Sequence, residues 1–226
     1  MVINSHYQFI FVHIPKSAGT SVMKSLSQLR GNNKRWLANT KHETLVDFDA
    51  QFESRKNLYD RVRGMNPRNY YRFGFVRNPW DRMSSFYRYL TEKQPRHEIM
   101  TISSFKDFLI KTEEGCDWIQ TLHTMRPQID YFTNTDGNLN IDFLGHFEFL
   151  QEDLELVGER IGCRIKLPHL NSSTNSKRDY RSEFDNEMIE IVARRFREDI
   201  AHFGYAFDNI QPSVRCSKAL RRPRAL

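Results

Sequence analysis

The sequence predicts an α/β fold in three layers, with helices on both faces of a central, mainly parallel sheet. The apolar run at 9–14 is rich in aromatic and β-branched side chains, as expected for a strand that is buried on both faces, and residues 71–76 form the next strong strand pattern. Each run ends at a polar turn that contains proline, and a helical pattern follows. In sheets of this kind such turns gather at the carboxyl ends of the strands, where ligands bind.

The first polar turn has the composition of an anion-binding loop. Backbone amides of residues 17–21, beside the positive end of the following helix, would converge on a phosphate. Lys16 adds a positive charge, and Gly19 gives the loop its backbone freedom. Taken alone, the same composition also fits an ordinary turn with a helix cap. The candidate anion ligands are Lys16, Ser17, Ala18, Gly19, Thr20 and Ser21.

The remaining elements follow from apolar spacing and from breaker residues. A short apolar patch at 36–38 is predicted to form a second strand, and 141–147 a later one. Pro79 suits the first position of a helix because it has no amide to leave unsatisfied. Further helices are predicted over 43–52, 58–63, 117–123 and 150–161. Another helix is predicted to begin after a cap at Ser103 or Ser104. A last helix, opened by a capping box of Ser182 and Asp185, is predicted to run to about Ile200.

The composition fits one domain with an appended tail. The chain has 226 residues, a mass of 27.0 kDa, a formal net charge of +6 and a pI near 9.3. We assign residues 1–210 to a single domain and 211–226 to a basic C-terminal tail, because five Lys or Arg residues fall between Val214 and Arg224. The positive charge suits an anionic ligand but does not identify it.

The cysteine and hydropathy patterns argue against several classes of protein. The three cysteines are far apart and form no Cys-x-x-Cys pair, so we expect neither a disulfide framework nor a zinc site. No apolar run approaches the roughly eighteen residues of a membrane span, and the N-terminal sequence lacks the pattern of a secretory signal. These patterns predict a cytoplasmic protein without a membrane span.

Together, the turn at residues 15–21 and the second turn, which begins at Arg77, resemble the sulfotransferases that use 3′-phosphoadenosine 5′-phosphosulfate (PAPS). In that family the motif H-I-P-K-[TS]-x-G-[TS]-[TS] binds the 5′-phosphosulfate, and R-N-P-x-D-R-x-x-S binds the 3′-phosphate. The resemblance therefore assigns the 3′-phosphate to Arg77 and Ser85, with Lys177 and Arg178 as candidates to close over it. It implies a P-loop-like fold.

The resemblance is closest to the carbohydrate (Golgi-type) branch of the family and runs from about Phe9 to Tyr205. Animal members of this branch usually carry a membrane anchor and a lumenal stem, whose absence here also leads us to expect a cytoplasmic relative. Further segments that fit the branch are Lys41-His42, Arg126-Pro127-Gln128, Gly145-His146-Phe147-Glu148, the stretch 167–173 and Phe203-Gly204-Tyr205.

The implied reaction transfers a sulfuryl group from PAPS to an acceptor hydroxyl on a carbohydrate or a small metabolite. In-line attack of this kind needs a base for the hydroxyl proton and positive charge at the leaving phosphate, which Lys16 supplies. We choose His42 as the base, because an imidazole titrates near neutral pH, with Glu43 as the alternative and His123 as a weaker candidate. No metal is expected, since no carboxylate cluster is evident.

Two other classes remain as alternatives. A P-loop-type nucleotide-dependent kinase would need the loop G-x-x-x-x-G-K-[ST], whereas Lys16 precedes Gly19, and no aspartate follows the run at 71–76. A non-catalytic nucleotide-binding relative is the second alternative. A nucleic-acid binder is not expected, because the sequence has no stacking-aromatic motif and no zinc finger. Acceptor choice is assigned to the variable loops at 92–99 and 116–126.

Overall fold

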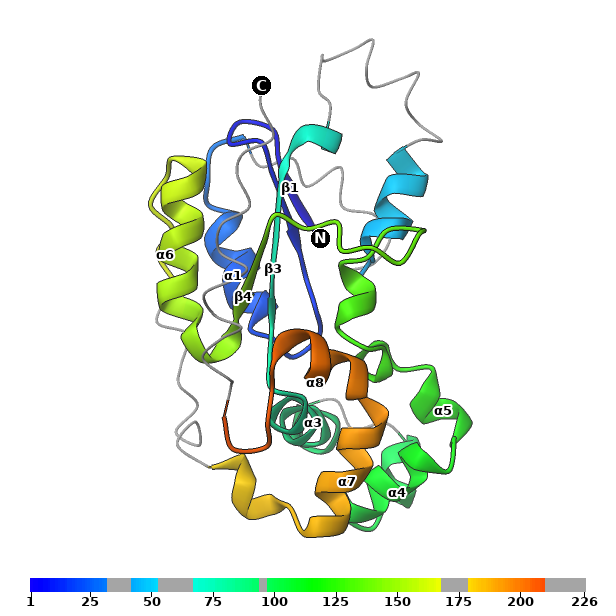
Figure 1. The fold of residues 1–226 in the computed structure, drawn as a ribbon. Coiled ribbons are helices and arrows are strands. Elements are labelled where there is room, and N and C mark those ends of the chain that lie inside the picture. The colour runs from blue at the N-terminus through cyan, green and yellow to red at the C-terminus, as the bar shows by residue number, and fades with distance from the viewer. Residues whose placement is uncertain (32–41, 53–66, 94–96, 168–178, 210–226) are drawn as a thin grey trace. The chain divides into compact units, whose positions relative to one another are not determined.

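The structure, a computed structural model, describes residues 1–31, 42–52, 67–93, 97–167 and 179–209 (Figure 1). The described residues form two compact units. The first unit comprises the stretches within 1–76 and 128–167, and the second comprises those within 77–127 and 179–209. The chain passes from the first unit to the second between Val76 and Arg77.

The first unit contains a four-stranded sheet in the order β1-β2-β3-β4. Strand β1 pairs antiparallel with β2, whereas β2 with β3 and β3 with β4 are parallel, so the predicted α/β class with a mainly parallel sheet is confirmed. The short strand β1 was not predicted. The strands are β1 (Val2–Asn4), β2 (Phe9–Val12), β3 (Tyr71–Val76) and β4 (Phe143–His146).

Two helices, α1 (Gly19–Leu26) and α6 (Leu150–Ile161), pack on the same core cluster of the sheet (Figure 1). The cluster is built from phenylalanines at alternate positions of β2 and β3, whose register places Phe11 opposite Phe73. Residues at the intervening positions are buried too, which explains why β2 is apolar throughout; in β3 the buried Arg72 pairs with Asp49 at 2.9 Å. Residues 45–52 are helical, as predicted, and short 3₁₀ turns span Pro67–Asn69, Ile129–Tyr131 and Phe147–Phe149.

The second unit is helical. Helix α3 begins at Pro79 as predicted, and Ser104 caps α4, since its hydroxyl accepts a hydrogen bond from the Asp107 amide at 3.1 Å. The α-helices are α3 (Pro79–Arg88), α4 (Phe105–Glu113), α5 (Asp117–Gln120), α7 (Asn186–Arg195) and α8 (Arg197–Phe203). A π-helix spans Tyr89–Lys93, and 3₁₀ helices span His97–Thr101, His123–Met125 and Tyr180–Glu183.

The prediction of one helix opened by Ser182 was wrong. Asp185 caps α7 by itself, accepting from the Met188 amide at 2.9 Å, while the Ser182 hydroxyl donates to the Asp179 carbonyl within a 3₁₀ turn. The helix is also interrupted, because Phe196 (φ −116°, ψ 30°) separates α7 from α8. The predicted strand at 36–38, the helical turn at 58–63, Lys177, Arg178 and the basic tail at 211–226 lie outside the described residues.

Candidate functional site

The loop between β2 and α1 has the backbone geometry of an anion-binding nest. Lys16 and Ala18 both have positive φ angles, 68° and 56°, and Ser17 lies between them. This alternation turns successive amides toward one point, at a cost of about 1 kcal/mol or more for each non-glycine residue in that region. Ala18 is also the N-cap of α1 and has no side-chain oxygen to accept the first helical amides. The Ser21 amide donates to the Ala18 carbonyl at 2.9 Å, so the amides that the loop offers to an anion at the start of α1 are those of Gly19 and Thr20.

Gly19 serves this loop differently from the sequence prediction. Its φ angle is not positive; the left-handed residues are Lys16 and Ala18. A Cβ atom at position 19 would lie 1.7 Å from Cδ2 of His13, because the imidazole packs directly against the glycine backbone. Glycine is needed here for close packing and not for backbone freedom.

The Ser17 side chain turns into the first unit. Its hydroxyl donates to Oε1 of Gln128 at 3.4 Å, and both residues are almost fully buried. Gln128 lies 111 residues further along the chain. This contact supports the centre of the loop from beneath, and it leaves Ser17 to contribute its backbone amide to a bound anion. Thr20 is exposed and Ser21 is half-buried, at the start of α1.

His42 lies against the residue that begins the loop. Its Nδ1 atom is 3.2 Å from the backbone carbonyl oxygen of His13, and the two imidazole rings are 4.6 Å apart. A carbonyl oxygen can only accept, so Nδ1 carries the proton in the neutral ring. The lone pair is then on Nε2, which is the tautomer that a general base requires.

Glu43 has a different environment from its neighbour. Its carboxylate is buried, with 5% relative exposure, and Oε1 accepts a hydrogen bond from Nε2 of Gln51 at 3.1 Å. Oε2 is buried and has no hydrogen-bond partner among the described residues. His42 is half-buried and so remains reachable from solvent. An acceptor can therefore reach His42 more readily than Glu43, and this favours the histidine as the base.

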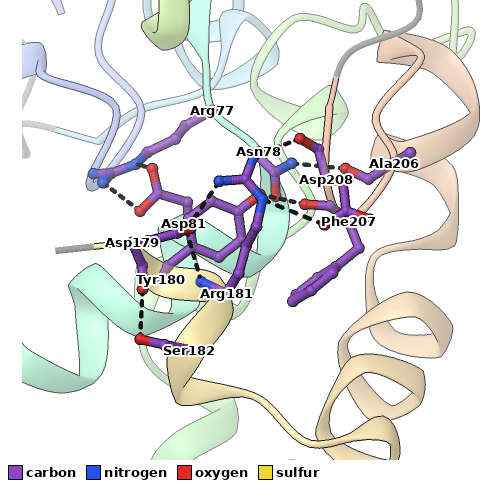
Figure 2. Close-up of polar contacts among 10 residues, drawn as sticks. All are labelled: Arg77, Asn78, Asp81, Asp179, Tyr180, Arg181, Ser182, Ala206, Phe207 and Asp208. Carbon is purple, nitrogen blue, oxygen red and sulfur yellow. Dashed lines mark hydrogen bonds and ion pairs between the residues drawn. The ribbon is translucent and has the colours of Figure 1, made fainter.

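In the second unit, Arg77 forms a bidentate ion pair with Asp81. Its Nε and Nη2 atoms each donate to the carboxylate at 2.8 Å, and both side chains are largely buried (Figure 2). Asn78 is the N-cap of α3, accepting from the Trp80 amide at 3.0 Å. The guanidinium is thus fixed at the start of a capped helix.

Ser85 shares a face of α3 with this ion pair. Asp81 and Ser85 are four residues apart within α3, so their side chains lie on one side of the helix, and Arg77, which precedes the N-cap Asn78, pairs with Asp81 from outside the helix. The neighbouring Ser84 is fully buried, and its hydroxyl donates to Glu183 at 2.6 Å. Ser84 is thereby engaged within the unit, whereas Ser85 is half-buried on the Arg77 face.

The segment at 206–208 closes over the start of α3. Nδ2 of Asn78 donates to the Ala206 carbonyl at 2.9 Å, and the Tyr180 hydroxyl donates to the Phe207 carbonyl (Figure 2). Arg181 bridges Asp179 and Asp208. Hydrogen bonds from the Arg181 amide and then its side chain hold the pKa of Asp179 below its usual value. These contacts fix the backbone next to Arg77.

The described residues contain neither a metal-binding cluster nor a membrane-spanning helix. No group of three or more His, Cys, Asp or Glu side chains in this part of the chain is arranged to hold a metal ion. Of the helices that the structure describes, none combines the length and apolar character needed to cross a bilayer.

A nest followed by a helix, at the end of a parallel strand, is an arrangement that suits an oxyanion in α/β proteins. The chain belongs to the sulfotransferase family, whose sequence model matches residues 1–206. It is also similar to carbohydrate sulfotransferase 14 of Danio rerio, with 20% identity over 244 residues. That alignment covers 92% of this chain, which spans 63% of the relative's length. No solved structure matches the chain.

The structure therefore brings the loop at 16–21 and His42 together within the first unit, and in the second it pairs Arg77 with Asp81, one helical turn before Ser85. Sequence reasoning did not assign a role to His13, Gln128 or Asp81, although each stands in or beside a segment that resembles the family. Signals existed for two of them. Asp81 stands four residues after Arg77, and His13 begins the first motif.

Proposed function

We propose that this protein is a PAPS-dependent sulfotransferase with a P-loop-like three-layer fold, which transfers a sulfuryl group to an acceptor hydroxyl. The observation that carries the proposal is the loop at 13–18, where two left-handed residues and an uncapped helix start turn amides toward one point beside Lys16. Such a loop suits a dianionic phosphate or a phosphosulfate. Family membership supports the same assignment.

The residues present fit the two charged ends of the donor. The proposal assigns the 5′-phosphosulfate to the loop amides, Lys16 and the Thr20 hydroxyl. It assigns the 3′-phosphate to Arg77, which precedes α3, and to Ser85, which lies on the face of α3 that carries Asp81, the partner of Arg77. Arg77 is already oriented by Asp81, so little side-chain entropy is lost when a phosphate binds.

The chemistry divides between His42 and Lys16. In the proposed step Nε2 of His42 takes the proton from the acceptor hydroxyl, whose oxygen forms a new bond to sulfur while the bond from sulfur to the phosphate oxygen breaks. Lys16 and the loop amides stabilise the charge that grows on the leaving phosphate. The donor supplies the activated sulfuryl group, and the hydrogen bond to the His13 carbonyl holds His42 in the required tautomer.

The proposed acceptor is a carbohydrate or a small metabolite that bears a hydroxyl. The similar Danio rerio protein is named a carbohydrate sulfotransferase, and this name favours a carbohydrate over a small metabolite as the proposed acceptor. This chain spans only 63% of the length of that relative. The acceptor of this chain is therefore proposed from the similarity and the reaction chemistry together.

Calorimetry followed by a turnover assay tests the proposal. We expect 3′-phosphoadenosine 5′-phosphate (PAP) to bind far more tightly than adenosine 5′-phosphate or ATP, because only PAP has a 3′-phosphate for Arg77. A donor labelled in its sulfate should then pass the label to a mixture of oligosaccharides or metabolites. Preference for ATP over PAP would indicate a nucleotide-dependent kinase, and tight PAP binding without label transfer would indicate a non-catalytic relative.

A further inference from the structure

Strand β3 carries a buried charge that the proposed reaction does not use. Arg72, the second residue of this strand, has a side chain with 4% relative exposure. It lies at the amino end of β3, whereas Arg77 follows the carboxyl end. A buried guanidinium is costly unless it is paired and hydrogen-bonded, so its presence in a strand that is otherwise uncharged needs an explanation.

Asp49, on the helix at residues 45–52, pairs with this guanidinium. Nη1 and Nη2 of Arg72 donate to separate carboxylate oxygens of Asp49, at 3.3 and 2.9 Å. Nδ2 of Asn140 donates to the same carboxylate at 3.3 Å, and Nε of Arg72 is buried without a hydrogen-bond partner among the described residues. The charge of Arg72 is therefore compensated chiefly by Asp49, through a fork whose geometry is directional.

The helix at 45–52 is joined to the segment that carries His42. The amide and the hydroxyl of Thr44 donate to Oδ2 of Asp47 at 3.0 and 2.8 Å, and the Asp47 amide donates to Oγ1 of Thr44 at 3.1 Å. This reciprocal cap fixes the first turn of the helix. Glu43 is also hydrogen-bonded to the last turn. A displacement of the helix would therefore move His42 with it.

Apolar burial alone does not fix the position of this helix. Leu45 and Phe48 are buried on its inner face, but such burial is non-directional and tolerates small displacements. The fork from Arg72 to Asp49 specifies one position, because its hydrogen bonds weaken when the helix slides or turns. Fixing a register at some cost in stability is the best-attested use of a buried ionic group.

We propose that Arg72, acting through Asp49, is a positioning residue for His42. The fork holds the helix at 45–52 in the place from which Nδ1 of His42 reaches the His13 carbonyl at 3.2 Å. Nε2 then carries the lone pair that takes the acceptor proton. The effect on turnover rests on the proposed function, whereas the effect on the His42 ring is independent of any activity.

A cavity beside the ion pair makes a chemical rescue experiment feasible. Its volume is about 420 Å³, and Arg72, Asp49, Arg68 and Asn140 are among the residues that line it. Arg72→Ala would enlarge this cavity by the space of the lost side chain, next to the Asp49 carboxylate. A guanidinium ion from solution can then pair with that carboxylate as the side chain did.

Nuclear magnetic resonance of the full chain with ¹⁵N-labelled histidine measures the tautomer of His42, and His42→Ala assigns its signals. In the neutral ring of the wild type we expect the Nδ1-protonated form. Arg72→Ala should raise the fraction of the other tautomer several-fold, and added guanidinium, kept well below unfolding concentrations, should reverse this change. Asp49→Asn keeps the shape of the side chain and should have the same effect without rescue. Thermal midpoints show that each variant is folded.

Turnover is measured on the same samples with the sulfate-labelled donor and an oligosaccharide mixture. For Arg72→Ala we expect a fall of about 10- to 100-fold, the scale of a misplaced catalytic group, with PAP affinity unchanged and partial recovery in guanidinium. Asp142→Ala is the matched control, because Asp142 accepts the Arg72 amide at 2.8 Å and its loss leaves the fork to Asp49 intact. This control should lower the thermal midpoint without changing the His42 signal or the turnover.

An unchanged His42 signal in folded Arg72→Ala and Asp49→Asn, or an equal change in Asp142→Ala, would overturn the inference. A changed signal with normal turnover in an active protein would also overturn it, because the position of His42 would then not limit the reaction. A wild type that neither binds PAP nor transfers the label would instead contradict the proposed function. The His42 signal would still decide whether Arg72 positions the ring.

Discussion

Asp81 holds Arg77 through two parallel hydrogen bonds of 2.8 Å each. The relative exposures of the two side chains are 12% and 17%, so the pair is shielded from most of the solvent. A guanidinium that is bound along one edge keeps its remaining N–H groups in a fixed direction. In the proposed site Asp81 is therefore a positioning residue, and Arg77 is the residue that contacts the 3′-phosphate.

Arg77→Gln should abolish the preference for PAP over adenosine 5′-phosphate. The lost contact is a charge-assisted hydrogen bond to phosphate, so we expect PAP binding to weaken by roughly 1.5–3 kcal/mol. Affinity for adenosine 5′-phosphate should change little, because that nucleotide lacks the 3′-phosphate. Calorimetry measures the affinity of the variant for each of the two nucleotides. If both affinities fell equally, Arg77 would not be the residue that binds the 3′-phosphate.

Asp81→Asn tests whether Asp81 positions the Arg77 guanidinium. We expect a smaller loss of PAP preference than for Arg77→Gln, because the arginine remains but loses its ionised partner. Arg88→Gln is the matched control on the same helix, where Arg88 instead pairs with Glu183 at 2.7 Å. If Asp81→Asn strengthened PAP binding, the carboxylate would be a competitor for the guanidinium and not its support.

Much of the fold was predictable because local patterns coincide with the final packing. The bounds of β3 and α6 match the predicted 71–76 and 150–161, since strand burial and helical spacing both end at clear breakers. Gly162 adopts φ 72° just after α6, a conformation that glycine takes without strain. By contrast, the apolar spacing of four continues through Phe196 although the helix does not, because spacing records which face is buried and not whether the backbone is continuous.

The supports of the candidate site were not predictable in the same way. Ser17 and Gln128 are 111 residues apart, and His13 meets both Gly19 and His42 in space. Such contacts depend on tertiary packing, which periodicity within a window of residues does not contain. The sequence could therefore indicate an anion loop and a candidate base, while the tautomer of that base needed the structure.

Gly19→Ala tests the packing beneath the loop. The new Cβ atom would overlap Cδ2 of His13, so the loop or the imidazole must shift, and we expect a loss of about 1–3 kcal/mol in the free energy of unfolding. PAP binding should weaken as well, because the loop amides move. Chemical denaturation and calorimetry measure the two effects.

A double-mutant cycle with His13→Ala identifies the cause. Removing the imidazole should make Gly19→Ala less costly, since the overlapping atom is gone. Gly137→Ala serves as the control: its φ is 75° and a Cβ atom there would meet no heavy atom within 4 Å, so only backbone strain of about 1–2 kcal/mol applies. An unchanged cost of Gly19→Ala in the His13→Ala background would exclude the clash.

Asp185 should make the stability of the second unit depend on pH. The Met188 amide, and then the Lys106 ammonium, hold the pKa of this carboxyl below its usual value. The folded pKa is thus lower than the unfolded value of about 3.9, so the stabilisation is present above that value and is lost as pH falls through the folded pKa. Thermal midpoints of Asp185→Asn and the wild type should differ near neutral pH and converge in acid.

Lys16→Ala should lower turnover more than it weakens PAP binding. The ammonium matters most as charge develops on the leaving phosphate, so its loss belongs mainly to the transition state. We expect kcat and kcat/KM to fall together, with a smaller change in the PAP dissociation constant. A rise in KM at constant kcat would limit Lys16 to ground-state binding. Lys24→Ala, an exposed lysine on α1, controls for the change in net charge.

His42→Ala should cut turnover by about 10²–10⁴-fold, the usual contribution of a general base, and should leave PAP affinity nearly unchanged. In the wild type the rate should rise with pH along one ionisation, because only the neutral imidazole can take the acceptor proton. That ionisation should disappear from the mutant's profile. Both results must occur together, since a damaged fold would lower turnover without sparing PAP binding.

Glu43→Gln tests whether the neighbouring carboxylate, and not His42, is the general base. Its partner Gln51 can still bond to the amide oxygen, so we expect the fold to persist and turnover to stay near that of the wild type. The bond from His42 Nδ1 to the His13 carbonyl keeps Nε2 unprotonated in the neutral ring, as a base at His42 requires. If Glu43→Gln abolished turnover while His42→Ala retained it, the base would be the buried carboxylate, and the orientation of His42 would belong to the packing of the loop.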